Sequence, residues 1–286
     1  MPRRVLVTGA SGFVGKTTVE RLAKDGFTVR AMVRSPRKVP RAQENVVGDV
    51  SDPASLHKAA TDCDVVIHLV AIIKEIKGAT FDKVIAEGTR NVVEAATDAK
   101  RIVYVSALGT GPDARGGYYE AKWKAEEAVR ESGKPYTILR PSTIFGPGDE
   151  FVNQFAGKFV PLPAGGSTKF QPVHVRDIAE MLSCAALRDI DGVFEVGGPD
   201  VFTLRQMIDI AEKKLGKKAW HPSIPLGLAK LGAKLVFDPL LKLGVNMPAG
   251  SGALAMLDRD NVCDPVEMRR THLAFGIEPR PFAANV

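Results

Sequence analysis

Three polar side chains near the middle of the chain have the types and spacing of a proton-transfer site: Ser106, Tyr118 and Lys122. Residues 118–131 have a helical pattern, and positions four apart on a helix share one face, as Tyr118 and Lys122 would. An ammonium beside a phenol lowers the phenol pKa from about 10 toward neutral pH. Such a tyrosine can exchange a proton with a carbonyl or alcohol oxygen, which Ser106 can hold by a hydrogen bond. Tyr119 is a competing phenol with the weaker i+3 spacing, and a Tyr–Lys contact without catalytic role is the alternative reading.

A glycine-rich turn near the N-terminus predicts a phosphate site. Gly9, Gly12 and Gly15 fall at i, i+3 and i+6 between a predicted strand, residues 4–8, and a predicted helix, residues 13–24. In this context the glycines permit the tight turn, the approach of a pyrophosphate and close helix–strand packing. The helix N-terminus then presents free N–H groups to the phosphates. The candidate cofactor-binding residues of this turn are Gly9, Ser11, Gly12, Phe13, Val14 and Gly15.

The residues after the second predicted strand, residues 27–33, indicate which dinucleotide is bound. NAD enzymes usually carry an acidic residue there for the ribose hydroxyls. This chain has Arg34 and Arg37 instead, which can hold a 2′-phosphate. We therefore expect NADP(H) in preference to NAD(H), with two solvated arginines as the alternative. Further candidates at the strand ends are Asp49, placed to accept from the adenine amino group, Val50, Val70 and Ala71.

Strands and helices that alternate along the chain position these residues. Short apolar, β-branched runs alternate with helical patterns, which predicts a parallel sheet covered by helices on both faces. We expect an α/β fold, a Rossmann-type doubly wound parallel sheet with a smaller, mainly helical C-terminal lobe. Residues 1–140 would form the dinucleotide-binding domain, and residues 141–286 a substrate lobe that returns some elements to the main sheet. The predicted strands are residues 4–8, 27–33, 46–47, 65–70, 102–105, 136–139, 170–175 and 193–196, and the predicted helices are residues 13–24, 81–99, 118–131 and 176–187.

Several features of the second half carry local predictions. Glycine and proline are dense over residues 146–166, which suggests loops over a cleft. Thr203 and Gln206 have the spacing of a capping box. His174 precedes a helix and would cap it or face the cleft, whereas His68 lies in an apolar strand and is expected to be a satisfied core histidine.

Residues 224–245 alternate apolar residues with lysines, with Pro239 breaking the pattern. Lys230 and Lys234 are one helical turn apart. This segment could be a basic amphipathic surface for a membrane or a protein partner. The alternative is a helical lid whose apolar face packs on the core.

Composition excludes several classes of protein. The chain has 286 residues, 45% hydrophobic and 25% charged, which is ordinary for a globular protein. The formal charge of +6 attracts anionic ligands. The sequence has no basic stripe interleaved with aromatic residues, so it does not favour nucleic-acid binding. Three widely spaced cysteines fit a reducing compartment, and we expect no metal site. Without a signal peptide or a transmembrane run, we expect a cytoplasmic protein, or a membrane-peripheral one.

Taken in order, these motifs resemble the extended and atypical branch of the short-chain dehydrogenases/reductases, which includes sugar-nucleotide epimerases and dehydratases. The glycine turn, Asp49, Ser106, Tyr118 and Lys122 fall in the order of that family. Residues 139–149, 171–179 and 275–279 further resemble the dehydrogenase-like accessory subunits of respiratory complex I. The resemblance implies that Lys122 also holds the cofactor ribose. It further implies that the nicotinamide end is lined by Pro141, Ser142 and Thr143.

Three functions follow as expectations. The first is an NAD(P)(H)-dependent oxidoreductase that transfers hydride between nicotinamide and a carbonyl or alcohol substrate, with Tyr118 as proton donor or acceptor. The second is a non-catalytic NADPH-binding accessory or redox-sensing subunit. The third is a sugar-nucleotide epimerase or dehydratase with tightly held NAD. The apolar stretch at residues 84–86, where extended members usually have an asparagine, and the short connection between Ser106 and Tyr118 weaken this third reading.

Overall fold

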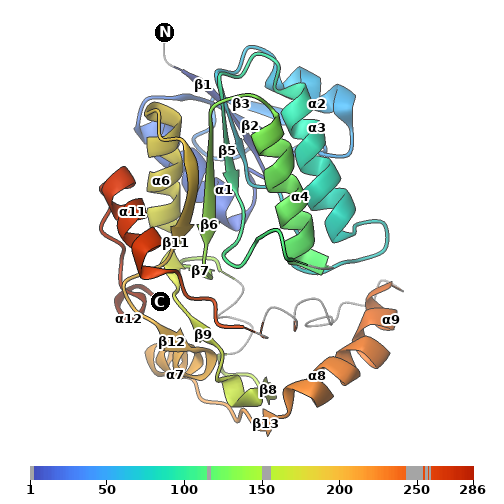
Figure 1. Ribbon diagram of the computed structural model, residues 1–286, viewed down its shortest axis with the longest axis vertical. Helices are drawn as coiled ribbons and strands as arrows, with labels where there is room; N and C mark the ends of the chain where they lie inside the picture. Colours follow the sequence, from blue (N-terminus) through green and yellow to red (C-terminus); the bar gives the residue numbers. More distant parts are fainter. Residues whose placement is uncertain (1–2, 115–116, 150–155, 243–253, 255–256, 258) are drawn as a thin grey trace.

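A parallel sheet of seven strands dominates the structure, a computed structural model that describes residues 3–114, 117–149, 156–242, 254, 257 and 259–286. The spatial order is β11-β6-β5-β4-β1-β2-β3, and it reverses between β1 and β4 (Figure 1). Doubly wound sheets bind their ligands at such a reversal, beyond the carboxyl ends of the strands. The strands are β1 (Arg4–Thr8), β2 (Thr28–Val33), β3 (Glu44–Val47), β4 (Val65–His68), β5 (Arg101–Val105), β6 (Tyr136–Pro141) and β11 (Gly192–Val196). The predicted fold class is confirmed.

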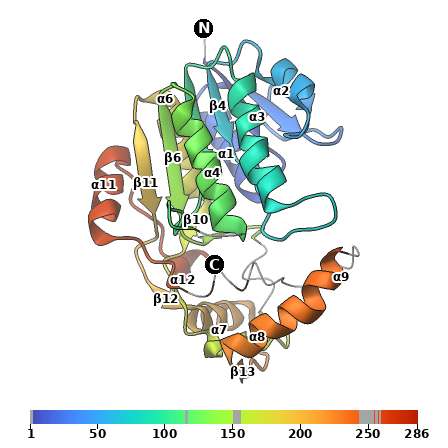
Figure 2. The same cartoon turned by 45° about the vertical axis from the view of Figure 1, so that its right-hand side comes forward.

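Helices cover both faces of this sheet (Figures 1 and 2). One face carries α1 (Phe13–Lys24), α6 (Val175–Leu187) and α11 (Pro265–Phe275). The other face carries α2 (Pro53–Ala60), α3 (Gly88–Ala95) and α4 (Gly117–Glu131). Because successive strand residues point to opposite faces, Val5 and Val7 pack with the first group and Leu6 with α2 and α3. Continuous apolar strands are therefore needed, and β1 and β4 supply them.

A smaller lobe lies beyond the carboxyl ends of the main strands (Figure 1). It has its own apolar core, which includes Phe145, Leu162, Leu204 and the fully buried Phe282. Its two-residue strands are β7 (Ile144–Phe145), β8 (Leu162–Pro163), β9 (Lys169–Phe170), β10 (Val173–His174), β12 (Phe202–Thr203) and β13 (Ser223–Ile224). Its helices are η2 (Ala164–Gly166), α7 (Leu204–Leu215), α8 (Leu226–Gly232), η3 (Ala233–Phe237), α9 (Asp238–Lys242) and α12 (Phe282–Asn285).

Most predicted elements agree with these bounds to within one or two residues, but three do not. The helix predicted over residues 81–99 is divided into a π-helical segment η1 (Asp82–Glu87) and α3. The strand predicted over residues 170–175 is two short strands, β9 and β10. The predicted break at Pro239 is wrong, because α8, η3 and α9 follow one another without a gap. Pro239 is the second residue of α9 and lies inside this continuous helical run, directly after the π-helical segment η3. Its ring removes one backbone N–H donor from the run.

Two predicted caps are confirmed. Thr203 and Gln206 form a reciprocal capping box at the start of α7. The Nδ1 atom of His174 accepts a hydrogen bond from the Arg176 N–H at the start of α6. Both histidine and threonine therefore act here as helix caps, which stabilise otherwise unpaired N–H groups.

Candidate functional site

The glycine turn brings backbone, not side chains, to the switch point of the sheet, the place between β1 and β4 where the strand order reverses. Gly9 has φ +72°, and a Cβ there would lie 3.1 Å from the Leu69 carbonyl carbon. A Cβ on Gly15 would lie 2.2 Å from the Gly9 oxygen, so helix α1 can pack here only with glycine. Gly12 is exposed and is the N-cap residue of α1. The turn thus leaves open backbone at a helix N-terminus, and such a cradle fits a dinucleotide pyrophosphate.

Around this turn, the predicted neighbours divide between packing and exposure. Val14 packs on the core, whereas Ser11 and Phe13 are half-buried. Ala71 is exposed after β4, and Val70 is half-buried. These residues border the open edge of the switch point and are accessible to a ligand there.

The predicted ribose end carries positive charge next to a carboxylate. Arg34 and Arg37 are both exposed beyond the end of β2. The Asp49 carboxylate accepts hydrogen bonds from Ser51 N and Ser51 Oγ at 2.9 and 2.7 Å. The Ser51 N–H bond, together with the charges of Arg34 and Lys83, holds the Asp49 pKa below its ordinary value. Asp49 is therefore an anion at neutral pH with two cations nearby, and Lys83 is a residue that the sequence patterns did not single out.

Val50, a predicted cofactor contact, lies between the end of β3 and the start of α3. It is buried, and its side chain packs against Gly88 at the start of α3, where an added Cβ would lie 2.9 Å from Val50 Cγ2. Its carbonyl accepts a hydrogen bond from Asn91 Nδ2 at 2.8 Å. The Val50 side chain therefore fixes α3 against the end of β3.

Ser106, Tyr118 and Lys122 meet at the carboxyl end of β5. The Lys122 side chain is 2% exposed, and its Nζ donates to the Val105 carbonyl at 2.7 Å. Val105 directly precedes Ser106, so this bond fixes the strand end that carries the serine. The Lys122 Nζ lies 5.9 Å from the centre of the Tyr118 ring. Ser106 is buried, with its Oγ 3.4 Å from Thr110 Oγ1.

Burial sets the ionisation of this set. It lowers the pKa of Lys122 to about 7, with the Glu126 charge opposing the change. Burial raises the pKa of Tyr118, to which the neighbouring Tyr119 also contributes. The expected lowering of the Tyr118 pKa is therefore wrong for this structure. The reason is that the ring is enclosed by Phe81 and Tyr119, while the ammonium points to a backbone carbonyl.

A row of polar side chains lies beneath Lys122. Thr8, His68 and Tyr104 are in register on the neighbouring strands β1, β4 and β5. Thr89 Oγ1 donates to the Ile85 carbonyl at 2.6 Å, so it accepts from His68 Nε2 at 3.1 Å. The Nδ1 atom of His68 then accepts from Thr8 Oγ1 at 2.6 Å. This pairing fixes one neutral tautomer of His68, and burial lowers its pKa to about 3. The expected core histidine is confirmed.

Tyr104 links this row to the lysine. Its ring stacks on His68 with the ring centres 5.6 Å apart, and Lys122 Nζ lies 4.8 Å from its centre. A cation over an aromatic face is stabilised by the ring quadrupole. Tyr104 is therefore a supporting residue that the sequence patterns did not identify, although its place in β5, two residues before Ser106, is visible in the sequence.

The segment predicted to line the nicotinamide end is partly engaged elsewhere. Pro141 and Ser142 are buried and Thr143 is half-buried. Ser142 Oγ lies 2.6 Å from Asn261 Oδ1 and accepts from Gln171 N at 3.1 Å. The Ser142 side chain is therefore directed at the small lobe.

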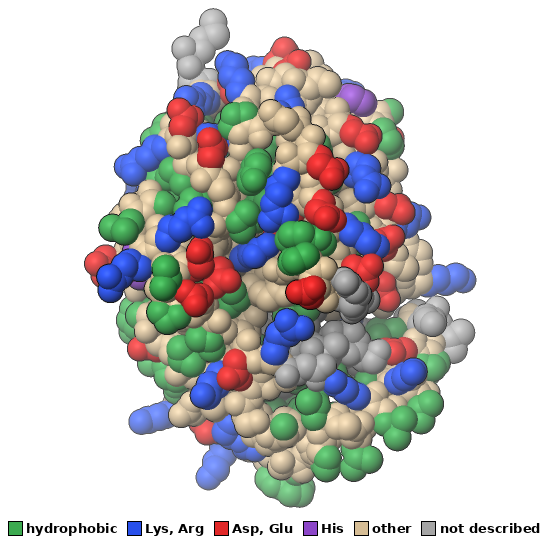
Figure 3. Space-filling model, in the orientation of Figure 1, with side chains coloured by type: hydrophobic (Ala, Val, Ile, Leu, Met, Phe, Trp, Pro, Cys, Tyr) green, Lys and Arg blue, Asp and Glu red, His purple; other side chains and the backbone are tan. Residues whose placement is uncertain are grey.

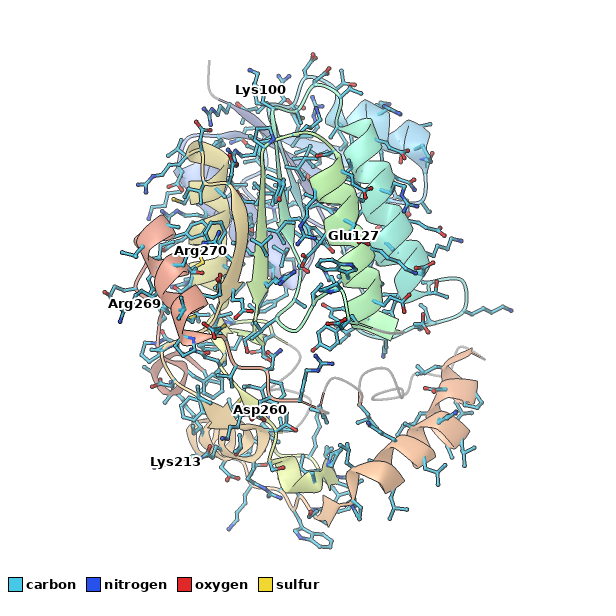
Figure 4. All side chains as sticks on the ribbon, in the orientation of Figure 1. Lys100, Glu127, Lys213, Asp260, Arg269 and Arg270 are labelled. Carbon is cyan, nitrogen blue, oxygen red and sulfur yellow. The ribbon has the colours of Figure 1, made fainter. Side chains whose placement is uncertain are left out.

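Asn261 joins the two halves of the molecule at this point. Its Nδ2 donates to the Leu108 carbonyl, two residues after Ser106, at 3.1 Å. Its backbone N–H donates to the Lys169 carbonyl, and the neighbouring Asp260 accepts from Lys169 N at 2.8 Å (Figure 4). No pattern in the sequence pointed to Asn261, because its role depends on contacts across more than a hundred residues.

Comparison with known proteins agrees with this site. Residues 9–190 match the family described as NAD(P)H-binding. The chain is 34% identical over 247 residues to NADH dehydrogenase [ubiquinone] 1 alpha subcomplex subunit 9 of Arabidopsis thaliana, covering 78% of this chain and 61% of the plant protein. It is 32% identical over 225 residues to the ceramide reductase of Caulobacter vibrioides, covering 75% of this chain and 71% of the reductase. The chain therefore spans less than two thirds of the plant subunit.

Solved structures share the fold. The UDP-glucose 4-epimerase of Thermotoga maritima superposes with a TM-score of 0.69 at 18% identity, over 97% of this chain and 94% of the epimerase. The predicted resemblance to extended short-chain dehydrogenases/reductases is confirmed. No helix among the described residues has the length and apolarity needed to cross a bilayer. With the glycine cradle, the switch point and the match over residues 9–190 together, the chain belongs to the NAD(P)H-binding family.

Proposed function

We propose that this protein is an NADP(H)-dependent reductase of carbonyl groups in apolar, lipid-like substrates. The single observation that supports catalysis best is the buried Lys122, which holds the end of β5 beside Ser106 and lies under the Tyr118 ring. Burying a lysine costs free energy. A buried lysine with a strongly shifted pKa beside a cleft is therefore a candidate functional group. The dinucleotide, held by the glycine turn, would supply the hydride.

The protonated phenol of Tyr118 suits this side chain to the role of an acid. Because burial keeps the phenol protonated at neutral pH, Tyr118 would act as a general acid that donates its proton to the developing alkoxide. Ser106 would hold the same oxygen by a hydrogen bond. Lys122, with a pKa of about 7, would gain and lose a proton near neutral pH and so help to reprotonate the phenol. These roles fit the reduction of a carbonyl, with the dinucleotide supplying the hydride.

The class of substrate is argued from the relative of similar length. The ceramide reductase shares 32% identity, and its name specifies a lipid substrate. The exposed arginines after β2 support NADP(H) as the cofactor, because a guanidinium can bind a 2′-phosphate bidentately.

The test is NADPH oxidation with long-chain keto-lipids as substrates. Tyr118→Phe should reduce kcat by at least about a hundredfold with NADPH binding unchanged, since a general acid contributes about 10²–10⁴-fold. Arg34→Ala should raise the Kd for NADPH by about tenfold and leave the Kd for NADH unchanged. Arg269→Ala, on the distant α11, is the matched control (Figure 4). Full turnover by Tyr118→Phe would remove the catalytic assignment.

A second candidate is a nucleotide-binding accessory subunit without turnover. The observation that favours it is the 34% identity to the plant NADH dehydrogenase subunit. In that case NADPH would bind through the glycine turn, and neither Tyr118→Phe nor any keto-lipid would change the NADPH concentration over time. The same measurements of NADPH oxidation and NADPH binding therefore separate the two functions.

A further inference from the structure

The helical arm of the small lobe, residues 226–242, exposes leucines where a surface helix usually carries polar side chains. Leu228, Leu231 and Leu235 are 63%, 52% and 65% exposed. Their spacing of three and four places them on one face of the helix. Val236 adds a fourth exposed apolar side chain. Contiguous apolar surface of this kind marks an interaction site on a folded protein.

These leucines are not needed to attach the arm to the lobe. A different set of arm residues, Ala233 and Leu241, is buried. The arm therefore has one packed face and a separate exposed face. The sequence left two readings open for residues 224–245, of which 243–245 lie outside the described residues: a basic amphipathic surface and a helical lid packed on the core. The exposed leucines favour the first reading for this face.

Positive charge surrounds the exposed face. Residues 217–242 contain five lysines and one acidic residue, so they supply four of the chain's six net positive charges. Lys217, Lys218 and Lys234 are exposed. In Figure 3, hydrophobic side chains line the lower edge and lower right of the molecule, over this lobe, with Lys and Arg side chains among them.

Two aromatic side chains extend the apolar surface at the base of the arm. Trp220 is 72% exposed and precedes β13, and Phe159 is also largely exposed. Their ring centres are 5.6 Å apart. Tryptophan with lysine beside an apolar face is the composition of segments that lie in the interface of a bilayer.

We propose that the exposed face of the arm, formed by Leu228, Leu231, Leu235, Val236 and the neighbouring lysines, docks on an anionic lipid bilayer. Charge complementarity favours lipid headgroups, since each lysine near an anionic surface adds to binding. The leucines would enter the headgroup region, and the arm lies on the side of the molecule toward which the carboxyl ends of the strands point (Figures 1 and 2). Docking would place the dinucleotide site near membrane-borne substrates, but it does not depend on the proposed reaction.

The experiment is flotation of the full chain with vesicles of phosphatidylcholine, with and without phosphatidylglycerol. Binding should require the anionic lipid and decrease with salt. Leu228→Glu/Leu231→Glu and, separately, Lys218→Glu/Lys234→Glu should each weaken binding by at least about tenfold. The matched controls are Leu273→Glu and Arg269→Glu on α11, where Leu273 is 81% exposed. A blue shift of Trp220 fluorescence, measured in Trp123→Phe protein, should accompany binding.

Three outcomes would overturn the proposal: no flotation, equal flotation with both vesicle types, or unchanged flotation of both arm variants. Light scattering adds a fourth, because a dimer of the wild type that the leucine variant dissociates would assign the face to a second copy of the chain. NADPH affinity, measured for every variant, should stay unchanged. If docking fails while NADPH binding and keto-lipid reduction persist, only the docking proposal falls; if reduction fails while flotation persists, only the reductase proposal falls.

Discussion

Two helices of this protein distribute charge and apolar surface in opposite ways. In α4, Lys122 is almost fully buried. Its Nζ donates to the Val105 carbonyl and lies near the rings of Tyr104 and Tyr118. In α8, two leucines are more than half exposed, and Lys234 in the following η3 is exposed beside them. Both departures from ordinary burial cost free energy or solubility, so each marks a place where folding alone does not explain the residue.

The difference separates two kinds of function. The buried charge of α4 lies in a rigid setting, where neighbouring strands hold Thr8, His68 and Tyr104 in register. Precise proton transfer needs such fixed positions. The exposed leucines of α8 have no fixed partner among the described residues, which suits a surface proposed to contact a lipid bilayer. The following predictions test whether the two regions really differ in this way.

The largest effect should come from adding a methyl group in the rigid region. Gly15→Ala places a Cβ 2.2 Å from the Gly9 oxygen, so α1 must move away from β1. We expect the free energy of unfolding to fall by about 3 kcal/mol, as for severe overpacking. Urea denaturation measures this. Gly12→Ala is the control, because its φ of −75° suits alanine and an added Cβ there would lie 3.2 Å from the Gly9 oxygen instead of 2.2 Å. Its stability should change by less than about 1 kcal/mol. A loss for Gly15→Ala as small as that of the control would mean that the turn is not closely packed at Gly15.

A smaller, pH-dependent effect should come from Lys122. Its pKa is about 7 in the folded protein and near 10.5 in the unfolded chain. The unfolded chain therefore binds the proton more tightly, so the penalty on folding is fully present below pH 7 and decreases as pH rises to about 10.5. Lys122→Met should be more stable than the wild type by about 2 kcal/mol at pH 6, with the difference shrinking toward pH 10.

Thermal unfolding of both proteins across this pH range provides the measurement. Lys124→Met is the control, because Lys124 lies on the same helix with its charge paired at the surface. A stability difference independent of pH would show that Lys122 is not charged in the way described.

The smallest effect on stability should come from the arm. Leu228→Glu/Leu231→Glu removes only exposed side chains, so the free energy of unfolding should change by less than about 0.5 kcal/mol. Urea denaturation again provides the measurement. Leu56→Glu, at a fully buried position of α2, is the contrasting variant and should prevent stable folding. A loss of several kcal/mol in the arm variant would place the leucines in the core and remove the contrast between α4 and α8.

Much of the sheet was predictable because its strands are apolar and β-branched over their whole length. The bounds of β1 were predicted as observed, whereas β4 ends two residues before its predicted end. Helix α2 was missed, although Asp52 caps it and Pro53 opens it, a signal that the sequence contains. The π-helical turns of η1 and η3 were not predictable, because their register depends on packing against other elements.

The site was predictable in its residue types but not in its electrostatics. The i, i+4 spacing predicted that Tyr118 and Lys122 lie on one face of a helix. In the structure, Lys122 Nζ lies near the Tyr118 ring and is hydrogen-bonded to the end of β5. The direction of the Tyr118 pKa change was wrong, since desolvation depends on how Phe81 and Tyr119 enclose the ring. Asn261 and Tyr104 were missed, because contacts between distant segments leave no local pattern. The proposed roles of Ser106, Tyr118 and Lys122 in turnover stay predictions.

The bonds of Asn261 have a consequence for how molecules enter and leave. Asn261 is bonded to Leu108 beyond β5, and its partner Ser142 lies beyond β6, so one residue fastens the small lobe to two neighbouring strands of the sheet. These hydrogen bonds oppose a hinge motion that would separate the two halves. We therefore expect ligands to enter and leave through loop and side-chain rearrangements at the rim, with the two halves moving together.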